Sequence, residues 1–337
     1  MPMPVGKLPP EMLAELLGRV APDDPAVVVG PGIGRDVAVL DVGNPDSYLL
    51  AKTDPITFAT DEIGHYAVCV NSNDIATTGG LPRFMLGTLL LPKDTSDPAL
   101  ARDIFDQLHR ACKRFAIALV GGHTEVTAGL DRPILVGMML GEVARECLIT
   151  SAGAQVGDRV LLTKRVAVEG TSLIARELAD DLRRRGYDEP LLARARGMLH
   201  DPGISVLAEA QAAVGAGHVH AMHDPTEGGV ATGLHELAMA SEVGLAIEGD
   251  SIPVFPETAR ICSDLGLDPL GLIASGSLLI VAPEEASEAI IAACGERGIA
   301  CADIGQVRPA SEGVRMRRGG RWGDLPRYDQ DELTRLF

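Results

Sequence analysis

The chain has 337 residues and a formal net charge of −17, because 47 acidic residues outnumber 30 basic ones. This excess of acid argues against nucleic acid as a partner, which would require a basic surface, and against an anionic membrane. Hydrophobic residues make up 46% of the chain and charged residues 23%, so we expect a folded protein of about two domains rather than a disordered chain.

The cysteines and the hydropathy pattern bear on the compartment. The six cysteines are widely spaced and form no C-x-x-C pair or short Cys/His cluster of the kind that binds zinc. We therefore expect reduced thiols, most of them small core residues. No apolar run reaches the roughly 18 residues of a membrane helix, and the first residues carry no apolar signal core. These features predict a soluble, cytoplasmic protein.

The spacing of apolar residues predicts helices and strands mixed along the whole chain. In the first half we expect a helix at 11–20, strands at 26–29, 37–42 and 48–52, a helix from about residue 62, a strand at 84–91, a helix at 98–115, and strands at 117–120 and 134–143. In the second half we expect a strand at 159–163, helices at 170–185, 203–214 and 228–241, and strands at 278–281 and 300–304 around a helix at 284–297. This mixture is typical of the α/β or α+β class. A turn-rich linker at 151–157 predicts two domains, 1–152 and 153–337.

Acidic residues beside glycine, or at the ends of predicted elements, form the most informative pattern. Asp36 closes the turn Gly30-Pro-Gly-Ile-Gly-Arg, and Asp54 follows the strand 48–52. The turn reads G-x-G-x-G and leads into a strand, so it does not fit the dinucleotide-binding fingerprint, which opens a helix. The alternatives are a plain glycine turn and a turn or helix cap at Thr53-Asp54.

Asp74 is a carboxylate that helical spacing places among apolar residues. It falls on one helical face with Ile63, Ala67 and Val70. A carboxylate on an apolar face is costly unless it is paired or bound to metal. The alternative is that Asn73 or Asp74 caps a new short helix.

Two further motifs combine glycine with histidine and acid. Gly121-Gly-His-Thr-Glu125 directly follows the predicted strand 117–120, and His223-Asp-Pro-Thr-Glu-Gly-Gly229 leads into a helix. The amides at such a helix start suit an anion. The alternatives are a hydrogen-bonded core histidine with a solvated glutamate in the first motif, and simple helix capping in the second.

Together these motifs supply only oxygen ligands, without cysteine or paired histidine. Such a set favours Mg²⁺, which takes a few carboxylates together with substrate phosphates. Without metal the same carboxylates would repel ATP, so we expect metal and nucleotide to bind together. The acidic residues concerned are Asp36, Asp54, Asp74, Glu125, Asp224 and Glu227.

The order of these motifs resembles that of the PurM-like superfamily of AIR synthase-related proteins, and most closely its HypE-like members. The pattern is G-x-G-x-x-D-x-A-V, T-D, N-D-I-A-x-x-G, G-G-x-T, H-D-P-T-E-G-G and A-S-G-x-L-L. In this chain the motifs are Gly32–Val39, Thr53-Asp54, Asn73–Gly79, Gly121–Thr124, His223–Gly229 and Ala274–Leu279. One such motif would mean little, whereas six in order are specific.

The resemblance implies an α/β (α+β) fold of two domains, in which N-terminal strands pair across a homodimer into a β-barrel beside a C-terminal α/β domain. It implies ATP and Mg²⁺ in the cleft between the domains. Carried over by motif, the Mg²⁺ ligands are Asp36, Asp54, Asp74 and Asp224. The nucleotide contacts are Gly32, Gly34, Thr53, Asn73, Gly121, Gly122, Thr124 and Glu227. The catalytic candidates are Asp74, His123 and Lys164.

Lys164 and Glu169 follow the first strand of the second domain, where the superfamily often has a substrate loop. They are possible contacts to substrate or phosphate. The alternative is a surface loop with one ion pair, which would contribute little energy.

The chain also departs from the pattern of the resembled families. His123 stands where HypE-like and kinase-like members usually have an acid or a related polar group, and Arg35 replaces the first acid of a usual pair. HypE-like members end in a tail with a terminal cysteine that is carbamoylated and then dehydrated, whereas this chain ends at Phe337 and its last cysteine is Cys301. We therefore do not expect that self-modification.

Other members of the superfamily fit less well. The thiamine-monophosphate kinase fingerprint D-x-S-D-G is absent, because Pro225-Thr226-Glu227 stands in its place. Selenophosphate synthetase would require a reactive residue in a glycine-rich N-terminal loop, and no cysteine precedes Cys69.

The resemblance implies an ATP- and Mg²⁺-dependent enzyme that phosphorylates an oxygen of a small-molecule or protein-borne acceptor, followed by dehydration, cyclisation or phosphoryl transfer. Three alternatives stay open. The first is AIR synthase itself, the phosphoribosylformylglycinamidine cyclo-ligase. The second is a nucleotide-binding maturation scaffold without turnover, and the third is a metal-free structural protein.

Overall fold

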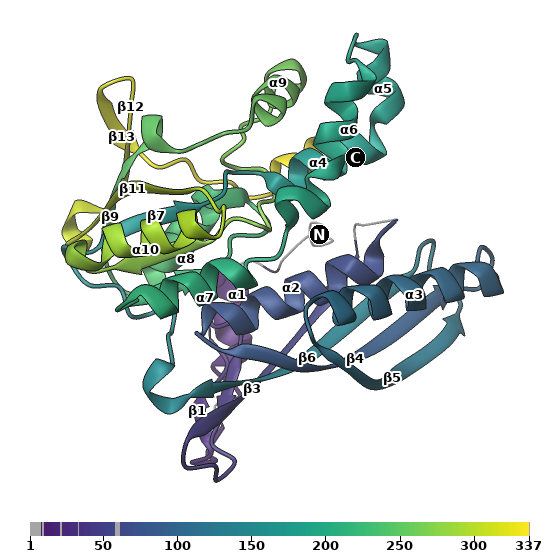
Figure 1. The fold of residues 1–337 in the computed structure, drawn as a ribbon, viewed down its shortest axis with the longest axis horizontal. Coiled ribbons are helices and arrows are strands. Elements are labelled where there is room, and N and C mark those ends of the chain that lie inside the picture. The colour runs from purple at the N-terminus through teal and green to yellow at the C-terminus, as the bar shows by residue number, and fades with distance from the viewer. Residues whose placement is uncertain (1–7, 9, 21, 33, 58–60, 337) are drawn as a thin grey trace.

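The structure is a computed structural model that describes residues 8, 10–20, 22–32, 34–57 and 61–336. The chain forms two halves, each built on its own sheet (Figure 1). Mixed α/β structure in two domains, as the sequence predicts, is confirmed. Within the described residues, no helix is both long enough and apolar enough to cross a membrane.

The N-terminal half is a six-stranded sheet with two long helices. Its elements are α1 (Pro10–Leu17), β1 (Val27–Val29), β2 (Ala38–Leu40), β3 (Ser47–Ile56), α2 (Ile63–Thr77), β4 (Leu81–Pro92), α3 (Pro98–Arg114), β5 (Ala118–Thr127) and β6 (Ile134–Ala144). The strand order is β1-β2-β3-β6-β4-β5. Among the described strands of this sheet, β4 and β5 form the one parallel pair. Strand β5 lies at an edge because it is the last strand in the order.

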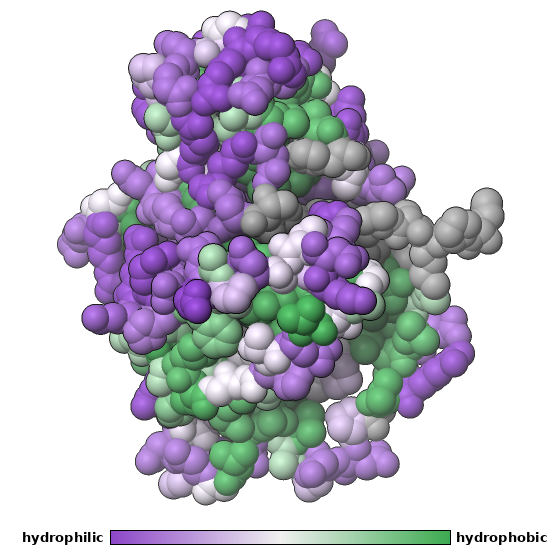
Figure 2. Space-filling model, turned by 90° about the vertical axis from the view of Figure 1, so that its right-hand side faces the viewer, coloured by the Kyte–Doolittle hydropathy of each residue, from purple (hydrophilic) through white to green (hydrophobic). Residues whose placement is uncertain are grey.

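Helices α2 and α3 cover one face of this sheet (Figure 1). Along β6, buried and accessible residues alternate, as expected for a sheet with one face in the core. Phe84, Val120, Val126 and Met138 remain exposed on β4, β5 and β6. Figure 2 shows apolar surface gathered at the height of the N-terminal sheet, whereas the surface at the height of α5 and α6 is hydrophilic.

The C-terminal half is a seven-stranded sheet with helices. Its elements are β7 (Arg159–Thr163), α4 (Val168–Glu177), α5 (Ala179–Arg184), α6 (Glu189–Gly197), α7 (Leu207–Ala216), β8 (Ala221–His223), α8 (Gly229–Ala240), β9 (Gly244–Glu248), α9 (Pro256–Leu265), β10 (Leu279–Ala282), α10 (Glu284–Glu296), β11 (Cys301–Arg308), β12 (Val314–Arg318) and β13 (Arg321–Asp324). The strand order is β13-β12-β9-β11-β7-β10-β8.

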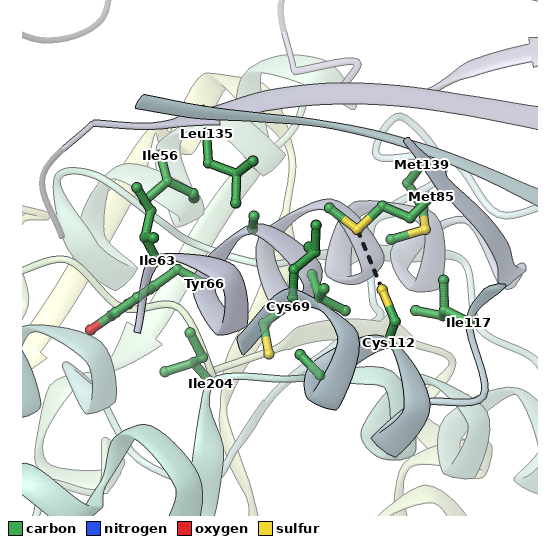
Figure 3. Packing of buried hydrophobic residues seen from close by; sticks show 14 of the residues in the cluster. Ile56, Ile63, Tyr66, Cys69, Met85, Cys112, Ile117, Leu135, Met139 and Ile204 are labelled. Atoms are coloured by element: carbon green, nitrogen blue, oxygen red, sulfur yellow. Dashed lines mark hydrogen bonds between the residues drawn. The ribbon is translucent and has the colours of Figure 1, made fainter. Parts of the chain in front are cut away.

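Helix α2 lies where the two halves meet. It packs on β3, β4, β6 and α3 of its own half and also on α7 and β8 of the other (Figure 1). Nearly all of its residues are buried. Figure 3 shows the core beside it, where Met85, Cys112 and Met139 pack together. Because α2 is enclosed on both sides, its polar residues sit in a low-dielectric environment between the halves.

Several local expectations need correction. Strand β5 continues to Thr127, so the segment Gly121–Thr124 lies inside a strand and not in a turn after it. Strand β3 continues to Ile56, so Asp54 lies inside it. Helix α2 is continuous through residues 73 and 74, so helical-face placement is right and capping there is wrong.

The second half holds elements that the apolar spacing does not reveal. The predicted helix 170–185 is two helices, α4 and α5, that meet at Leu178. The unpredicted elements are α6, β8, α9, β9, β12 and β13. The short helix α6 and the exposed strands β12 and β13 carry too few periodic apolar residues to stand out.

Candidate active site

A buried lysine lies at the centre of three of the predicted carboxylates. Lys52 and Asp54 lie two residues apart on β3, so both point to the same face of the sheet. The Nζ atom of Lys52 lies 3.0 Å from Asp74 Oδ2, 3.2 Å from Asp54 Oδ2 and 4.0 Å from Asp36 Oδ1. Its side chain is only 10% exposed. Despite this burial, the three carboxylates hold the pKa of Lys52 above its ordinary value, so the amine is charged.

A fourth carboxylate, Asp224, joins this group from the C-terminal half. It follows β8 and is buried, and its Oδ2 atom has no hydrogen-bond partner among the described residues. Burial raises its pKa well above the ordinary value, and the charges of Asp74 and Asp36 raise it further. Burial raises the pKa of Asp74 as well, against the attraction of Lys52. One lysine therefore does not neutralise four carboxylates.

His223 connects Asp36 to helix α8. Its Nε2 lies 2.9 Å from Glu236 Oε2, and its Nδ1 lies 4.0 Å from Asp36 Oδ2. The histidine thus bridges two acids at the rim of the group. Asp36 is the most accessible of the four predicted metal ligands, with 40% of its side chain exposed.

The donor set of this group fits Mg²⁺. Its atoms are all oxygens, and one of them is a buried carboxylate oxygen without a partner. In the described part of the chain, no three ligating side chains converge as in a preformed metal centre. Mg²⁺ does not need such a cage, because it keeps waters and takes one or two carboxylates together with substrate phosphates. Asp74 and Asp224 are the residues with uncompensated charge that would hold it.

A pocket opens beside the acidic group and is lined from both halves. Val29 and Val39 form part of its apolar wall, and Gly34, Asp36 and His223 lie on its polar side. Gly34 adopts a positive φ of 68°, which favours glycine there. Gly32 forms an isolated bridge with Arg35 in the same turn. The predicted glycine turn therefore borders a pocket with both apolar and acidic lining.

Two predicted nucleotide contacts have side chains that bond to backbone. Asn73 donates from Nδ2 to Ile204 O at 2.8 Å and accepts at Oδ1 from Val206 N at 2.9 Å. Thr53 donates its hydroxyl to Gly137 O at 2.9 Å. Asn73 therefore ties α2 to the C-terminal half, and Thr53 ties β3 to β6.

The ammonium group of Lys164 is also bound by other groups of the protein. Its Nζ lies 2.8 Å from Glu209 Oε1 and donates to Ser205 O at 2.6 Å and Gly203 O at 3.1 Å. The side chain is 6% exposed. The alternative of a surface loop with one ion pair is thus wrong, because the pair is buried. The predicted catalytic role of Lys164 would require these bonds to rearrange.

His123 lies far from the acidic group within one chain. It is exposed on β5, where its Nε2 lies 3.1 Å from Glu125 Oε2. Across the sheet His123 pairs with Thr88, Thr88 with Val136, and Val136 with Pro55, next to Asp54. Three strand spacings amount to about 14 Å. Thr124 and the two glycines before His123 share this exposed edge.

The acids of the second-domain motif face different neighbours. Asp224 faces Asp74 and Asp36, whereas Glu227 interacts with Glu169 and Asp331. The motif therefore contributes to two separate acidic groups. The predicted nucleotide contact at Glu227 stays a prediction.

Sequence reasoning missed three residues of the group. Lys52 carries a usable signal, because alternation on a strand places it beside Asp54. His223 carries a weaker signal, as the first residue of the motif that leads into α8. Glu236 gives no local signal, because it reaches His223 from 13 residues further along the chain, on α8.

The uncompensated charge predicts a stabilising substitution. Because folding raises the pKa of Asp74, the folded protein retains a proton that the unfolded chain loses at about pH 4, so stability falls as the pH rises above that value. We expect Asp74→Asn to remove this penalty, and its free energy of unfolding should exceed that of the wild type by more at pH 8 than at pH 4. Denaturant unfolding across this pH range measures the difference.

Asp41 provides the matched control for this experiment. Arg145, at 2.7 Å, lowers the pKa of Asp41, so Asp41→Asn should destabilise the protein at neutral pH. If the free energies of unfolding of Asp74→Asn and wild type differ by the same amount at every pH, the charge of Asp74 is not uncompensated.

The two adjacent glycines of β5 should respond differently to alanine. A Cβ on Gly122, whose φ is 149°, would lie 1.9 Å from Gly87 O on β4. At Gly121 the nearest such atom is Leu86 Cδ2, 3.9 Å away. We expect Gly122→Ala to lower the free energy of unfolding by about 1–3 kcal/mol or more, as overpacking does, and Gly121→Ala to have little effect. Equal unfolding midpoints would show that β4 and β5 are not held this closely.

Comparison with known proteins identifies the family. The N-terminal domain model of AIR synthase related protein matches residues 34–143, and the C-terminal domain model matches residues 155–317. A hydrogenase expression/formation protein of Methanocaldococcus jannaschii is 28% identical over 77% of this chain and 76% of its own length. Carbamoyl dehydratase HypE of Rhizobium leguminosarum bv. viciae is 29% identical over 74% of this chain and 67% of its own.

Solved structures agree with the sequence relatives. Hydrogenase maturation protein HypE, crystallised in complex with ATP, superposes with a TM-score of 0.71 and 25% identity over 92% of both chains. The chain therefore belongs to the AIR synthase-related proteins, as a PurM-like and HypE-like member.

Proposed function

We propose that this protein is an ATP- and Mg²⁺-dependent enzyme that transfers the γ-phosphoryl group of ATP to an oxygen of an acceptor. The observation that carries the proposal is the group of four carboxylates around Lys52 at the junction of the two halves. Excess negative charge with unpaired oxygen destabilises the protein by itself. Such a cost is understandable where the carboxylates bind a cation and, through it, a nucleotide.

The relatives support this reading. One named relative is a carbamoyl dehydratase, and another member of the family is crystallised with ATP. In a site of this kind Mg²⁺ neutralises charge on the phosphates, and positioning supplies much of the catalysis. Asp74 and Asp224 would hold the metal. Lys52 would fix the orientation of Asp54 and Asp74, and its own positive charge would face the phosphates.

The pocket beside Asp36 is the place where we expect the rest of the nucleotide. Its wall of Val29 and Val39 suits an apolar ring face, and it opens directly onto the acidic group. Gly32 and Gly34 shape the turn at its edge. The acceptor would be a small molecule or a group carried by another protein. Its phosphorylated oxygen would either leave with the phosphate, in a dehydration or cyclisation, or stay in the product as a phosphate ester.

We also propose that the protein acts as a homodimer. The exposed apolar residues on β4, β5 and β6 support pairing of two N-terminal sheets into a barrel. In such a dimer Gly121, Gly122, His123 and Thr124 could approach the partner's site, which would reconcile their family motif with their distance from Asp54 in one chain.

Calorimetry of ATP binding tests the proposal. We expect wild-type protein to bind ATP only when Mg²⁺ is present, because without metal the carboxylates repel the triphosphate. Asp74→Asn should lose at least about tenfold in affinity for ATP with Mg²⁺, since a charge-assisted contact is removed. Asp97→Asn, at the cap of α3, is the control and should bind as the wild type does.

The possible outcomes separate the candidate functions. Absence of ATP binding with Mg²⁺, or equal binding by Asp74→Asn, would contradict the proposed site. Binding followed by no phosphate release with any candidate acceptor would favour a maturation scaffold. Rescue of a purine auxotroph would instead identify AIR synthase activity.

A further inference from the structure

A second set of polar groups lies outside the site described above, where α2 meets α4. Tyr66 on α2 is 1% exposed, and its hydroxyl has no hydrogen-bond partner among the described residues. Glu169 on α4 is 7% exposed, and its Oε2 atom also has no partner there. Figure 3 shows the ring of Tyr66 beside Ile63 in the core, with its oxygen directed away from the labelled apolar side chains. Two unsatisfied buried groups from different halves require an explanation.

Tyr66 and Glu169 interact electrostatically, although no hydrogen bond joins their free oxygen atoms. Glu169 is the charge that raises the pKa of Tyr66 most, after the effect of burial. Neither free atom forms a hydrogen bond with the other. Because each such orphan costs free energy, a missing third group between them is the simplest explanation.

The two charges that contribute most to the pKa of Glu169 are both negative. Burial is the largest effect and, together with repulsion by Asp331 and Glu227, raises its pKa to about 7, whereas hydrogen bonds from the hydroxyl and the backbone N–H of Ser275 act to lower it. On α2, the charge of Glu169 raises the pKa of Tyr66 and of Cys69. The described residues place no lysine or arginine in an ion pair with Glu169, because the nearby Arg176 is bound to Asp61 and Lys164 to Glu209.

The position of Glu169 is fixed by close packing rather than by a flexible loop. Gly170 donates its N–H to Ile273 O at 3.1 Å, and a Cβ there would lie 2.4 Å from Leu272 Cγ. The start of α4 is therefore pressed against the segment that carries Ser275. Glu227 and Asp331 are only half-buried, so they form the more accessible side of the set.

The geometry points to a binding subsite formed by Tyr66 and Glu169, with Glu227 and Asp331 at its rim, that takes a protonated amine of the acceptor. The free atoms are a carboxylate oxygen and a phenol oxygen, and both can accept from N–H. A cation with several N–H donors satisfies them and offsets three carboxylates at once. That the amine belongs to the acceptor rests on the proposed function, whereas the subsite rests on these four residues.

The subsite lies on the same helix as the phosphate-facing group. Tyr66 and Asp74 are eight residues apart on α2, or about 12 Å along its axis. One rigid helix therefore spaces the two groups, so an acceptor held by its amine at Tyr66 would extend along α2 toward Asp74.

Ligand-detected NMR with methylammonium as the probe tests the subsite, and tetramethylammonium, which has no N–H, is the matched control cation. We expect methylammonium to bind wild-type protein and tetramethylammonium to bind much more weakly. Glu169→Gln and Tyr66→Phe should each weaken methylammonium about tenfold, as the loss of a hydrogen bond to a charged group does. Glu257→Gln, in the first turn of α9, should leave it unchanged.

The pH dependence gives a second reading. Methylammonium affinity should rise from about pH 6 to about pH 8 as Glu169 loses its proton, and it should stay flat in Glu169→Gln. No detectable binding, equal binding of the two cations, or unchanged binding in both variants would each overturn the subsite.

The unfolding midpoints of the ligand-free variants show whether a loss of binding comes from a folding defect. Tyr66→Phe removes an unbonded hydroxyl, so its unfolding midpoint should equal or exceed that of the wild type. Tyr187→Phe, which removes a hydroxyl bonded to Asp264 at 2.7 Å, should lower it. A lower midpoint for Tyr66→Phe would mean that its hydroxyl is already satisfied, which overturns the proposal. ATP binding is measured separately, so its failure would contradict the proposed function and leave methylammonium binding to decide the subsite.

Discussion

The burial of charge on helix α2 is the constraint on which the rest of the site depends. Asp74 is enclosed between a sheet and the other half of the protein, and its carboxylate has one buried cation, Lys52, as its partner. Taking a carboxylate out of water costs several kcal/mol unless it is well paired. The addition of Asp224 from the second half makes the charge imbalance worse. The fold therefore holds together a group of carboxylates whose negative charge one lysine does not balance.

Helix α2 also explains why the two halves act as one unit. Asn73 bonds to the backbone of the second half, and Tyr66 faces Glu169 there. The same helix thus carries a structural contact, a buried carboxylate and an unsatisfied hydroxyl. A shift of one half against the other would change all three together, so binding at one group would be felt at the other.

Much of the site was predictable from sequence because it consists of short motifs in a fixed order. Asp36, Asp54, Asp74 and Asp224 do meet, although they come from both halves. Most strands and helices also follow from apolar periodicity. The role of each side chain did not follow, because burial and long-range bonds decide it: Lys164, a predicted contact to substrate or phosphate, is enclosed with its own partners.

The most direct test of the central claim is a count of protons released when Mg²⁺–ATP binds. Calorimetry near pH 7 in buffers of different ionisation enthalpy gives this number. If Asp74 and Asp224 have raised pKa values and hold the metal, binding must drive their protons off, so wild-type protein should release protons and Asp224→Asn should release fewer. Binding without proton release, or equal release by the variant, would contradict a metal site built on uncompensated buried carboxylates.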